Sequence, residues 1–198
     1  MGKKTSEENK PKLLAIEAAR IFDAEVSALI GVFASSNYQW RVLSNDPMWK
    51  KPSFPTKKMI MDEIESFNPT FIHFALHGSN EGLILQPEKD FATLTWSEIE
   101  TMPCWKDSVI IAGSCGILSH ADVFLKAGAY AVVAPNGEIK WDRLCHFFRI
   151  FYSNIIHSDQ TLSEALETTS QHGNKYYIEY LMSFGIIGNK DWALDRKI

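Results

Sequence analysis

Short apolar runs alternate with amphipathic segments along most of this chain. Most of the runs are continuous, which is typical of strands that are buried on both faces of a sheet. Each run stops at glycine, proline or a polar residue, so we expect strands at Leu13–Ile16, Tyr38–Leu43, Phe71–His77, Ser108–Ala112, Tyr130–Pro135 and Tyr180–Phe184.

The segments between these runs carry apolar residues at helical spacing, as in Ala24–Ala34 and Lys57–Phe67. Several helix starts are also marked by residue types that cap helices. Caps are predicted at Thr56, at Thr95 with Glu98, at Asp142 before a helix to about Ile156, and at Thr161 with Glu164.

Strands that alternate with helices in this order indicate an α/β fold. We expect a mostly parallel, doubly wound sheet of about six strands with helices on both faces. Residues 1–11 are polar without apolar periodicity and are expected to form a flexible tail, whereas residues 12–198 are expected to form one domain.

Two apolar runs end at reactive side chains that are followed by glycine. One run ends at His77-Gly78 and the next major run leads into Gly113-Ser114-Cys115-Gly116. Neighbouring parallel strands would bring both ends to one edge of the sheet, where open α/β folds place their sites. An imidazole beside a thiol is the arrangement of a cysteine nucleophile and its base.

The other reactive residues have simpler structural explanations. His73 is expected to be a buried residue of the same strand, and Cys104 and Cys145 to be small buried hydrophobic residues, the latter on the inner stripe of the long helix. His77 by itself is also compatible with a polar residue that ends a strand. Its functional interpretation depends on Cys115.

The order of these motifs resembles the caspase-like cysteine peptidases, and most closely the CHAT branch, which includes separase-related and bacterial members. The resemblance covers most of residues 12–187 and also includes Ala127–Ala134 and Trp141-Asp142. It implies that His77 is the base and acid, that Cys115 is the nucleophile, and that the backbone N–H groups of Gly78 and Cys115 form the oxyanion hole.

The resemblance further implies an endopeptidase that an activating or regulatory protein partner switches on in a bacterial defence or signalling system. Caspases proper have glutamine where this chain has Gly113, so strict aspartate specificity is not expected. Glu17 and Asp142 are weak candidates for substrate-binding residues, because a solvated loop charge or a helix cap is the simpler explanation of each.

Two functional classes other than a peptidase share features with this sequence. The turn at Cys115 resembles the nucleophile elbow of glutamine amidotransferases, but Ile117 replaces the second glycine and no strand-terminal histidine follows. A caspase-like scaffold that serves in assembly without catalysis is the alternative to a peptidase.

Composition says more about the partners and the cellular compartment of the protein than about any reaction that it catalyses. The chain of 198 residues has a net charge of -4 and six tryptophans without basic interleaving, which gives no reason to expect nucleic acid as a partner. Three cysteines without zinc spacing, no secretory signal and no long apolar run favour a cytoplasmic protein without a membrane partner, metal or cofactor.

Overall fold

The computed structural model describes residues 10–18, 23–49, 52–86, 92–137, 144–172 and 184–194. The strands are β1 (Lys12–Glu17), β2 (Gln39–Ser44), β3 (Phe71–Ala75), β4 (His77–Gly78), β5 (Gly82–Ile84), β6 (Thr93–Thr95), β7 (Val109–Ala112), β8 (Ala131–Pro135) and β9 (Phe184–Gly188). The helices are α1 (Asp23–Ser35), α2 (Lys57–Phe67), α3 (Trp96–Thr101), α4 (Ala121–Lys126), α5 (Leu144–His157) and α6 (Leu162–His172), with short 3₁₀ turns at Pro103–Trp105 and Leu118–His120.

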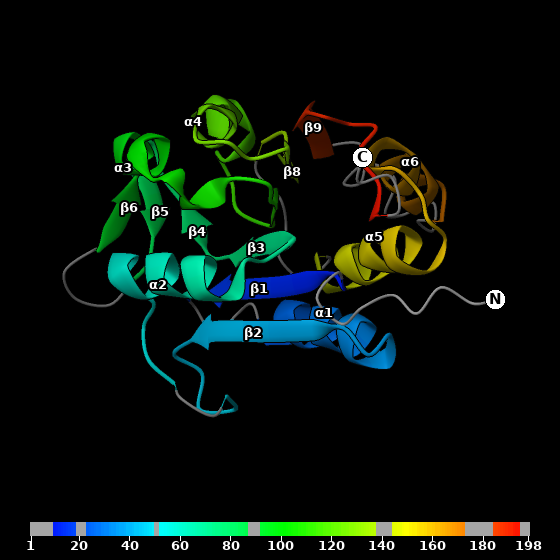
Figure 1. Cartoon of the computed structure of the whole chain (residues 1–198), viewed down its shortest axis with the longest axis horizontal. Coiled ribbons are helices and arrows are strands. Elements are labelled where there is room, and N and C mark those ends of the chain that lie inside the picture. The colour runs from blue at the N-terminus through cyan, green and yellow to red at the C-terminus, as the bar shows by residue number, and fades with distance from the viewer. Residues whose placement is uncertain are drawn as a thin grey trace.

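A six-stranded sheet in the order β2-β1-β3-β7-β8-β9 forms the centre of the molecule (Figure 1). Its first five strands are parallel and β9 is antiparallel to β8. The chain first moves outward from β1 to β2 and then returns to place β3 on the other side of β1. This reversal lies beside β3, and such switch points open a crevice at the carboxyl ends of strands.

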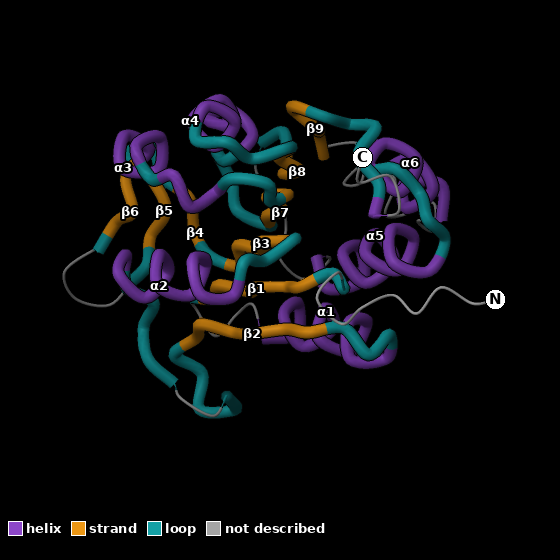
Figure 2. The backbone as a smooth tube through the Cα atoms, in the orientation of Figure 1, coloured by secondary structure: helices purple, strands orange, loops and turns teal. Residues whose placement is uncertain are grey.

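Helices cover both faces of the central sheet, as Figure 2 shows for α1 and α2 on opposite sides of β1 and β2. One hydrophobic cluster joins the sheet to α1 and α5, and a second joins it to α2, α3 and α4. Alternate residues of β3 belong to different clusters, with Phe71 and Ala75 in the first and Ile72 and Phe74 in the second. The period of two along a strand therefore divides the core into two layers.

Aromatic edge-to-face contacts connect the elements of the first layer. The ring of Phe33 on α1 lies 5.9 Å from that of Phe71 on β3 and 5.6 Å from that of Tyr152 on α5. Such ring pairs contribute about 0.5–1.5 kcal/mol beyond the burial of their area. They fix α1 and α5 on the same face of the sheet.

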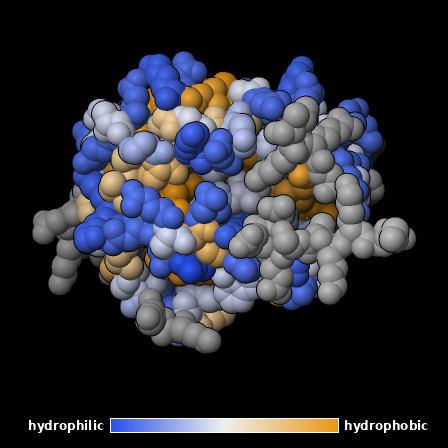
Figure 3. All heavy atoms as spheres, in the orientation of Figure 1, coloured by the Kyte–Doolittle hydropathy of each residue, from blue (hydrophilic) through white to orange (hydrophobic). Residues whose placement is uncertain are grey.

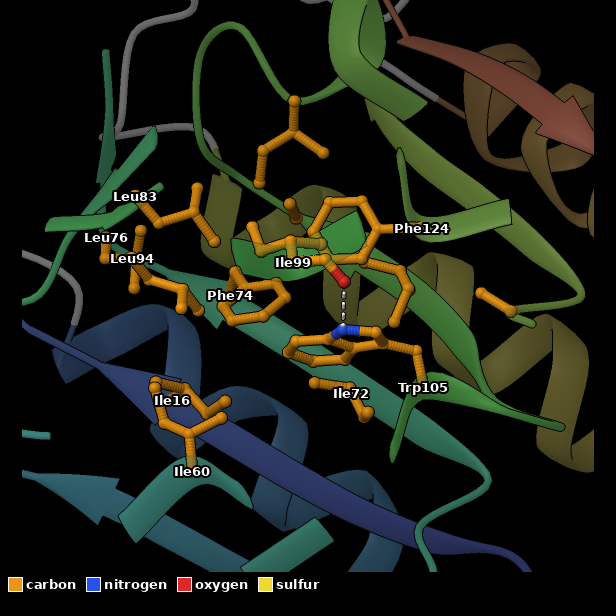
Figure 4. Packing of buried hydrophobic residues seen from close by; sticks show 14 of the residues in the cluster. Ile16, Ile60, Ile72, Phe74, Leu76, Leu83, Leu94, Ile99, Trp105 and Phe124 are labelled. Carbon is orange, nitrogen blue, oxygen red and sulfur yellow. Dashed lines mark hydrogen bonds between the residues drawn. The ribbon is translucent and has the colours of Figure 1, made fainter. Parts of the chain in front are cut away.

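The second layer is centred on Phe74, Trp105 and Phe124 (Figure 4). Trp105 is fully buried, and its indole N–H donates a hydrogen bond of 3.0 Å to the carbonyl oxygen of Ile99. The indole N–H group of Trp105 therefore has an acceptor, which avoids the free-energy cost of an unpaired buried donor.

A second, smaller sheet follows β3 directly and consists of the antiparallel strands β4, β5 and β6. The sequence predicts one continuous strand to His77, and this boundary is wrong because β3 ends at Ala75. After Leu76, His77 and Gly78 pair with β5 instead of continuing in the central sheet. His73 and His77, which the sequence places on one strand, therefore lie on β3 and β4 of two different sheets.

Apart from the end of β3 and the last strand, the strands predicted for the central sheet agree with the structure, as do the caps at Thr56, Thr95 and Thr161, whereas β6 is not among the predicted strands. The doubly wound α/β fold with six strands is confirmed. The last strand differs from its prediction, because β9 comprises Phe184–Gly188 and shares only Phe184 with the predicted range. The predicted cap Asp142 lies outside the described residues.

The visible face of the molecule mixes polar and hydrophobic residues, and the described hydrophobic side chains lie in separate areas between polar ones (Figure 3). In the part of the chain that the structure describes, no helix is both long enough and apolar enough to cross a bilayer.

The N-cap of α2 allows a test of how much a capping hydrogen bond contributes to the stability of the protein. The Thr56 hydroxyl oxygen accepts a hydrogen bond of 3.2 Å from the Met59 N–H group. We expect Thr56→Ala to lower the free energy of unfolding in urea by about 1 kcal/mol. Thr56→Ser keeps the acceptor oxygen, so a loss of stability as large as that of the alanine variant would contradict this role.

Candidate active site

The strands β3 and β7 bring two candidate reactive segments to one edge of the central sheet. In their parallel register Phe74 lies opposite Ala112, so both strands end at the same level. The segment after β3 continues to His77 and Gly78, and the segment after β7 continues to Cys115. The parallel register of β3 and β7 therefore brings the two strand ends to one edge of the sheet, as the sequence predicts.

Hydrogen bonds between these segments extend beyond the last paired residues. The Gly113 N–H group donates to the Phe74 carbonyl oxygen at 3.1 Å. The buried Ser114 hydroxyl then donates to the Leu76 carbonyl oxygen at 2.5 Å. Ser114 thus fixes the residue before Cys115 to the residue before His77.

The closest approach in the site is between Gly78 and Cys115. A Cβ atom added to Gly78 would lie 2.0 Å from the Cys115 carbonyl oxygen, a separation that backbone atoms do not permit. Only glycine therefore fits at position 78 without a shift of the backbone. This contact places the His77-Gly78 segment directly against the turn that contains Cys115.

The two reactive side chains differ in exposure. His77 is exposed on β4, where it pairs in register with Ile84, whereas Cys115 is half-buried in the turn after β7. Gly116 follows Cys115 with φ of +79°, a backbone conformation that favours glycine. A sharp turn directly after the thiol keeps Cys115 at the edge of the sheet.

A buried polar network lies beside the turn that contains Cys115. The His73 Nε2 atom is 2.6 Å from the Glu25 Oε1 atom, and His73 Nδ1 is 3.2 Å from the Tyr152 hydroxyl oxygen. All three residues are buried. His73 is therefore the buried residue that the sequence predicts, with a carboxyl partner that the sequence does not reveal.

Glu25 is the part of this network that reaches the turn. A Cβ atom on Gly113 would lie 2.8 Å from its Oε1 atom and 3.1 Å from its Oε2 atom. Among the described residues, Oε2 has no hydrogen-bond partner. Burial raises the pKa of the Glu25 carboxyl, although the hydrogen bond and charge of His73 oppose this shift.

The candidate substrate-binding residues have different outcomes. Glu17 is at the carboxyl end of β1, opposite Ala75 of β3, and it is fully buried. Its Oε2 atom accepts a hydrogen bond of 3.2 Å from the Trp49 indole N–H group. It is not the solvated loop charge that one interpretation of the sequence suggests. Asp142 lies outside the described residues.

Cys104 and Cys145 are half-buried rather than fully buried. Cys145 is not among the buried residues of α5, so its predicted place on the inner stripe of this helix is only partly confirmed. Burial raises the pKa of the Cys104 thiol to about 11, which keeps this thiol protonated at neutral pH. Within the described ranges, no group of three or more histidine, cysteine or acidic side chains is arranged to hold a metal ion.

Sequence reasoning missed Glu25, Tyr152 and the role of Ser114. Glu25 occupies the first turn of α1 and Tyr152 the middle of α5, and no local pattern marks either as a partner of His73. Ser114 was part of the motif around Cys115, but its acceptor is a carbonyl oxygen on another strand. These partners come together only through tertiary structure.

Comparison with solved structures identifies the architecture. The structure is similar to a chain of the separase–securin complex of Saccharomyces cerevisiae, with a TM-score of 0.62 over 92% of this chain. The protein has a caspase-like fold. Sequence identity is 12%, and this chain covers 12% of the length of that chain, so the similarity concerns the fold alone.

Neither the scan against protein-family profiles nor the search of curated proteins gives a match. The expected caspase-like fold is thus confirmed by structural similarity. The assignment to the CHAT branch stays a prediction.

The contact between Gly78 and Cys115 can be tested by adding one methyl group. We expect Gly78→Ala to lower the free energy of unfolding by about 1–3 kcal/mol, because the backbone must move away from the Cys115 carbonyl oxygen. We also expect slower alkylation of Cys115 by iodoacetamide. Urea unfolding and mass spectrometry of the labelled peptide measure the two effects.

Gly31 is the matched control, because no atom lies within 4 Å of the Cβ position there. In the interior of α1, Gly31→Ala is expected to increase stability by up to about 1 kcal/mol and to leave alkylation unchanged. Equal behaviour of the two alanine variants would contradict the proposed close contact.

Glu25 provides a test through pH. Its raised pKa means that the folded state binds a proton at Glu25 more tightly than the unfolded state, so the contribution of Glu25 to stability is most favourable at low pH. We expect the free energy of unfolding to fall as pH rises from about 4.5 through the folded-state pKa, by at most about 1.4 kcal/mol per pH unit. In Glu25→Gln this fall should be absent. Parallel stability curves for the two proteins between pH 5 and pH 8 would exclude the effect.

Proposed function

We propose that this protein is a cysteine endopeptidase in which Cys115 is the nucleophile and His77 the general base and acid. The contact of Gly78 with the Cys115 carbonyl oxygen carries this proposal, because it puts the residue next to His77 against the nucleophile turn. A caspase-like fold supports it, since that fold belongs to a clan of cysteine peptidases.

In the proposed reaction, His77 takes the thiol proton of Cys115 and the thiolate attacks the carbonyl carbon of the scissile peptide bond. The N–H groups of Gly78 and Cys115 are the proposed donors to the developing oxyanion. The carbon–nitrogen bond then breaks, and the leaving amine receives the proton from His77. A water molecule, deprotonated by His77, hydrolyses the thioester and restores the thiol.

We further propose Glu17 as a substrate-binding residue. Its carboxyl group lies at the carboxyl edge of the sheet, one strand away from the segment that leads to His77. Glu17 is fully buried and hydrogen-bonded to Trp49, so in this proposal the Trp49 indole moves away and the carboxyl group then favours a positively charged substrate side chain. Asp142 is a second candidate on the sequence resemblance alone.

The proposed setting is a bacterial defence or signalling system of the CHAT type, in which a protein partner switches on the peptidase. The resemblance of the His77 and Cys115 motifs supports this part of the proposal. The similar yeast chain was solved as a complex of separase with securin, which is an example of a caspase-like fold bound to another protein.

Thiol chemistry tests the pair without knowledge of the substrate. We expect Cys115 to react with iodoacetamide at least about tenfold faster than Cys104, because a paired imidazole promotes the thiolate whereas Cys104 stays protonated. His77→Ala should remove most of this advantage, and His157→Ala on the exposed end of α5 serves as control. An unchanged Cys115 rate in His77→Ala would refute the pairing.

Proteolysis tests the reaction itself. Wild type and Cys115→Ala are incubated with the proteins encoded beside this one, and new termini are identified by mass spectrometry. Cuts that need Cys115 support the peptidase, and lysine or arginine before the cut supports the role of Glu17. No cut with a bound partner present would favour the scaffold.

A further inference from the structure

Trp96 and His120 form a stacked pair between two parts of the molecule that carry the candidate site. Trp96 begins α3, His120 ends the 3₁₀ turn before α4, and these two helices lie side by side (Figure 1). The ring centroids are 4.4 Å apart and the ring planes differ by only 8°. Trp96 is buried and His120 is half-buried.

Trp96 holds the loop that follows His77 and Gly78. Its backbone N–H group donates to the Glu81 carbonyl oxygen at 3.1 Å, and its indole N–H group donates to the Asn80 carbonyl oxygen at the same distance. Within this loop the Ser79 hydroxyl also donates to the Gly82 carbonyl oxygen at 3.0 Å. Trp96 therefore binds a turn that is also held by a hydrogen bond between its own residues.

His120 holds the turn that contains Cys115. Its Nδ1 atom lies 3.0 Å from the Gly116 carbonyl oxygen, and since a carbonyl accepts, the Nδ1 atom carries the proton in this bond. The Ser119 hydroxyl donates to the same oxygen at 2.8 Å. Both bonds act on the residue directly after Cys115.

We propose that Trp96 and His120 are positioning residues that couple the loop after His77 to the turn at Cys115. The stack transmits the position of one loop to the other, and so sets the relation of the imidazole to the thiol. This inference rests on the proposed peptidase function. It adds a second link between the two segments, on the outer side of the contact between Gly78 and Cys115.

The pair differs from ordinary core packing in what its polar atoms do. The Trp96 indole N–H group donates to the Asn80 carbonyl oxygen and the His120 Nδ1–H group to the Gly116 carbonyl oxygen, so each ring binds a main-chain oxygen of one loop. A pair that only filled space would need no donors aimed at both loops. Side chains that share contacts in this way give non-additive effects when they are changed together.

A comparison in two backgrounds separates positioning from structural support. The rate of Cys115 alkylation by iodoacetamide is measured for Trp96→Leu in wild type and in His77→Ala. We expect about a tenfold lower rate in the wild-type background and less than about a twofold change without His77, because only the imidazole can be misaligned. Equal losses in both backgrounds, or no loss in the first, would overturn the inference.

Conservative variants separate the stack from the hydrogen bonds and guard against misfolding. His120→Asn can keep a donor to the Gly116 oxygen but loses the ring, and Trp96→Phe keeps a ring but loses the bond to Asn80. We expect His120→Asn to show the loss and the double variant Trp96→Leu/His120→Asn to be no worse than either single change. Additive losses would speak against coupling. Urea unfolding confirms that each variant is folded.

Ser119→Ala is the matched control, since it removes the other hydrogen bond to the Gly116 oxygen and the 3.2 Å contact of its hydroxyl with His120 Nδ1 but keeps both rings of the stack. We expect less than about a twofold change in the alkylation rate for this variant. A loss as large as that of Trp96→Leu would assign the effect to the turn alone and overturn the coupling.

Hydrogen exchange tests the coupling independently of thiol chemistry. We expect Trp96→Leu to speed amide exchange at residues 115–120, and His120→Asn to speed it at residues 79–82. Changes confined to each variant's own loop would overturn the inference. If exchange is reciprocal but His77→Ala leaves the Cys115 rate unchanged, the coupling stands and the proposed peptidase function fails.

Discussion

The approach of Gly78 to the Cys115 carbonyl oxygen is the constraint on which the candidate site depends. Two backbones can come this close only where one residue has no side chain, and a Cβ atom at position 78 would lie 2.0 Å from that oxygen. The parallel pairing of β3 with β7 brings the two chain segments to the same level. The hydrogen bond from the Ser114 hydroxyl to the Leu76 carbonyl oxygen then joins the two segments beyond the last paired residues.

The layer beneath this contact is unusually polar for a protein core. Glu25 and His73 form a buried pair against Gly113, and Glu17 is buried one strand away. A buried ion pair often adds less stability than apolar side chains of the same volume. A gain in stability therefore does not explain the burial of Glu25 and His73.

The small sheet of β4, β5 and β6 gives the site its second wall. The chain leaves the central sheet after Ala75, so His77 belongs to an element that is anchored separately from Cys115. Trp96 and His120 connect that element to the turn after β7. A likeness to the separase–securin structure at 12% identity shows that this arrangement of layers is compatible with very different side chains.

The sequence alone determined the parallel strands of the central sheet, the caps at Thr56, Thr95 and Thr161, and the choice of His77 and Cys115 as candidate residues. These features depend on local periodicity and on residues close in the chain, which a sequence displays directly. It did not show that β3 ends two residues before His77, since the partner of β4 is the distant strand β5. Nor did it reveal the contacts of Glu25 with His73 or of Trp96 with His120, because each joins residues from separate elements. Only tertiary structure decides which distant side chains meet, since that depends on how the layers pack.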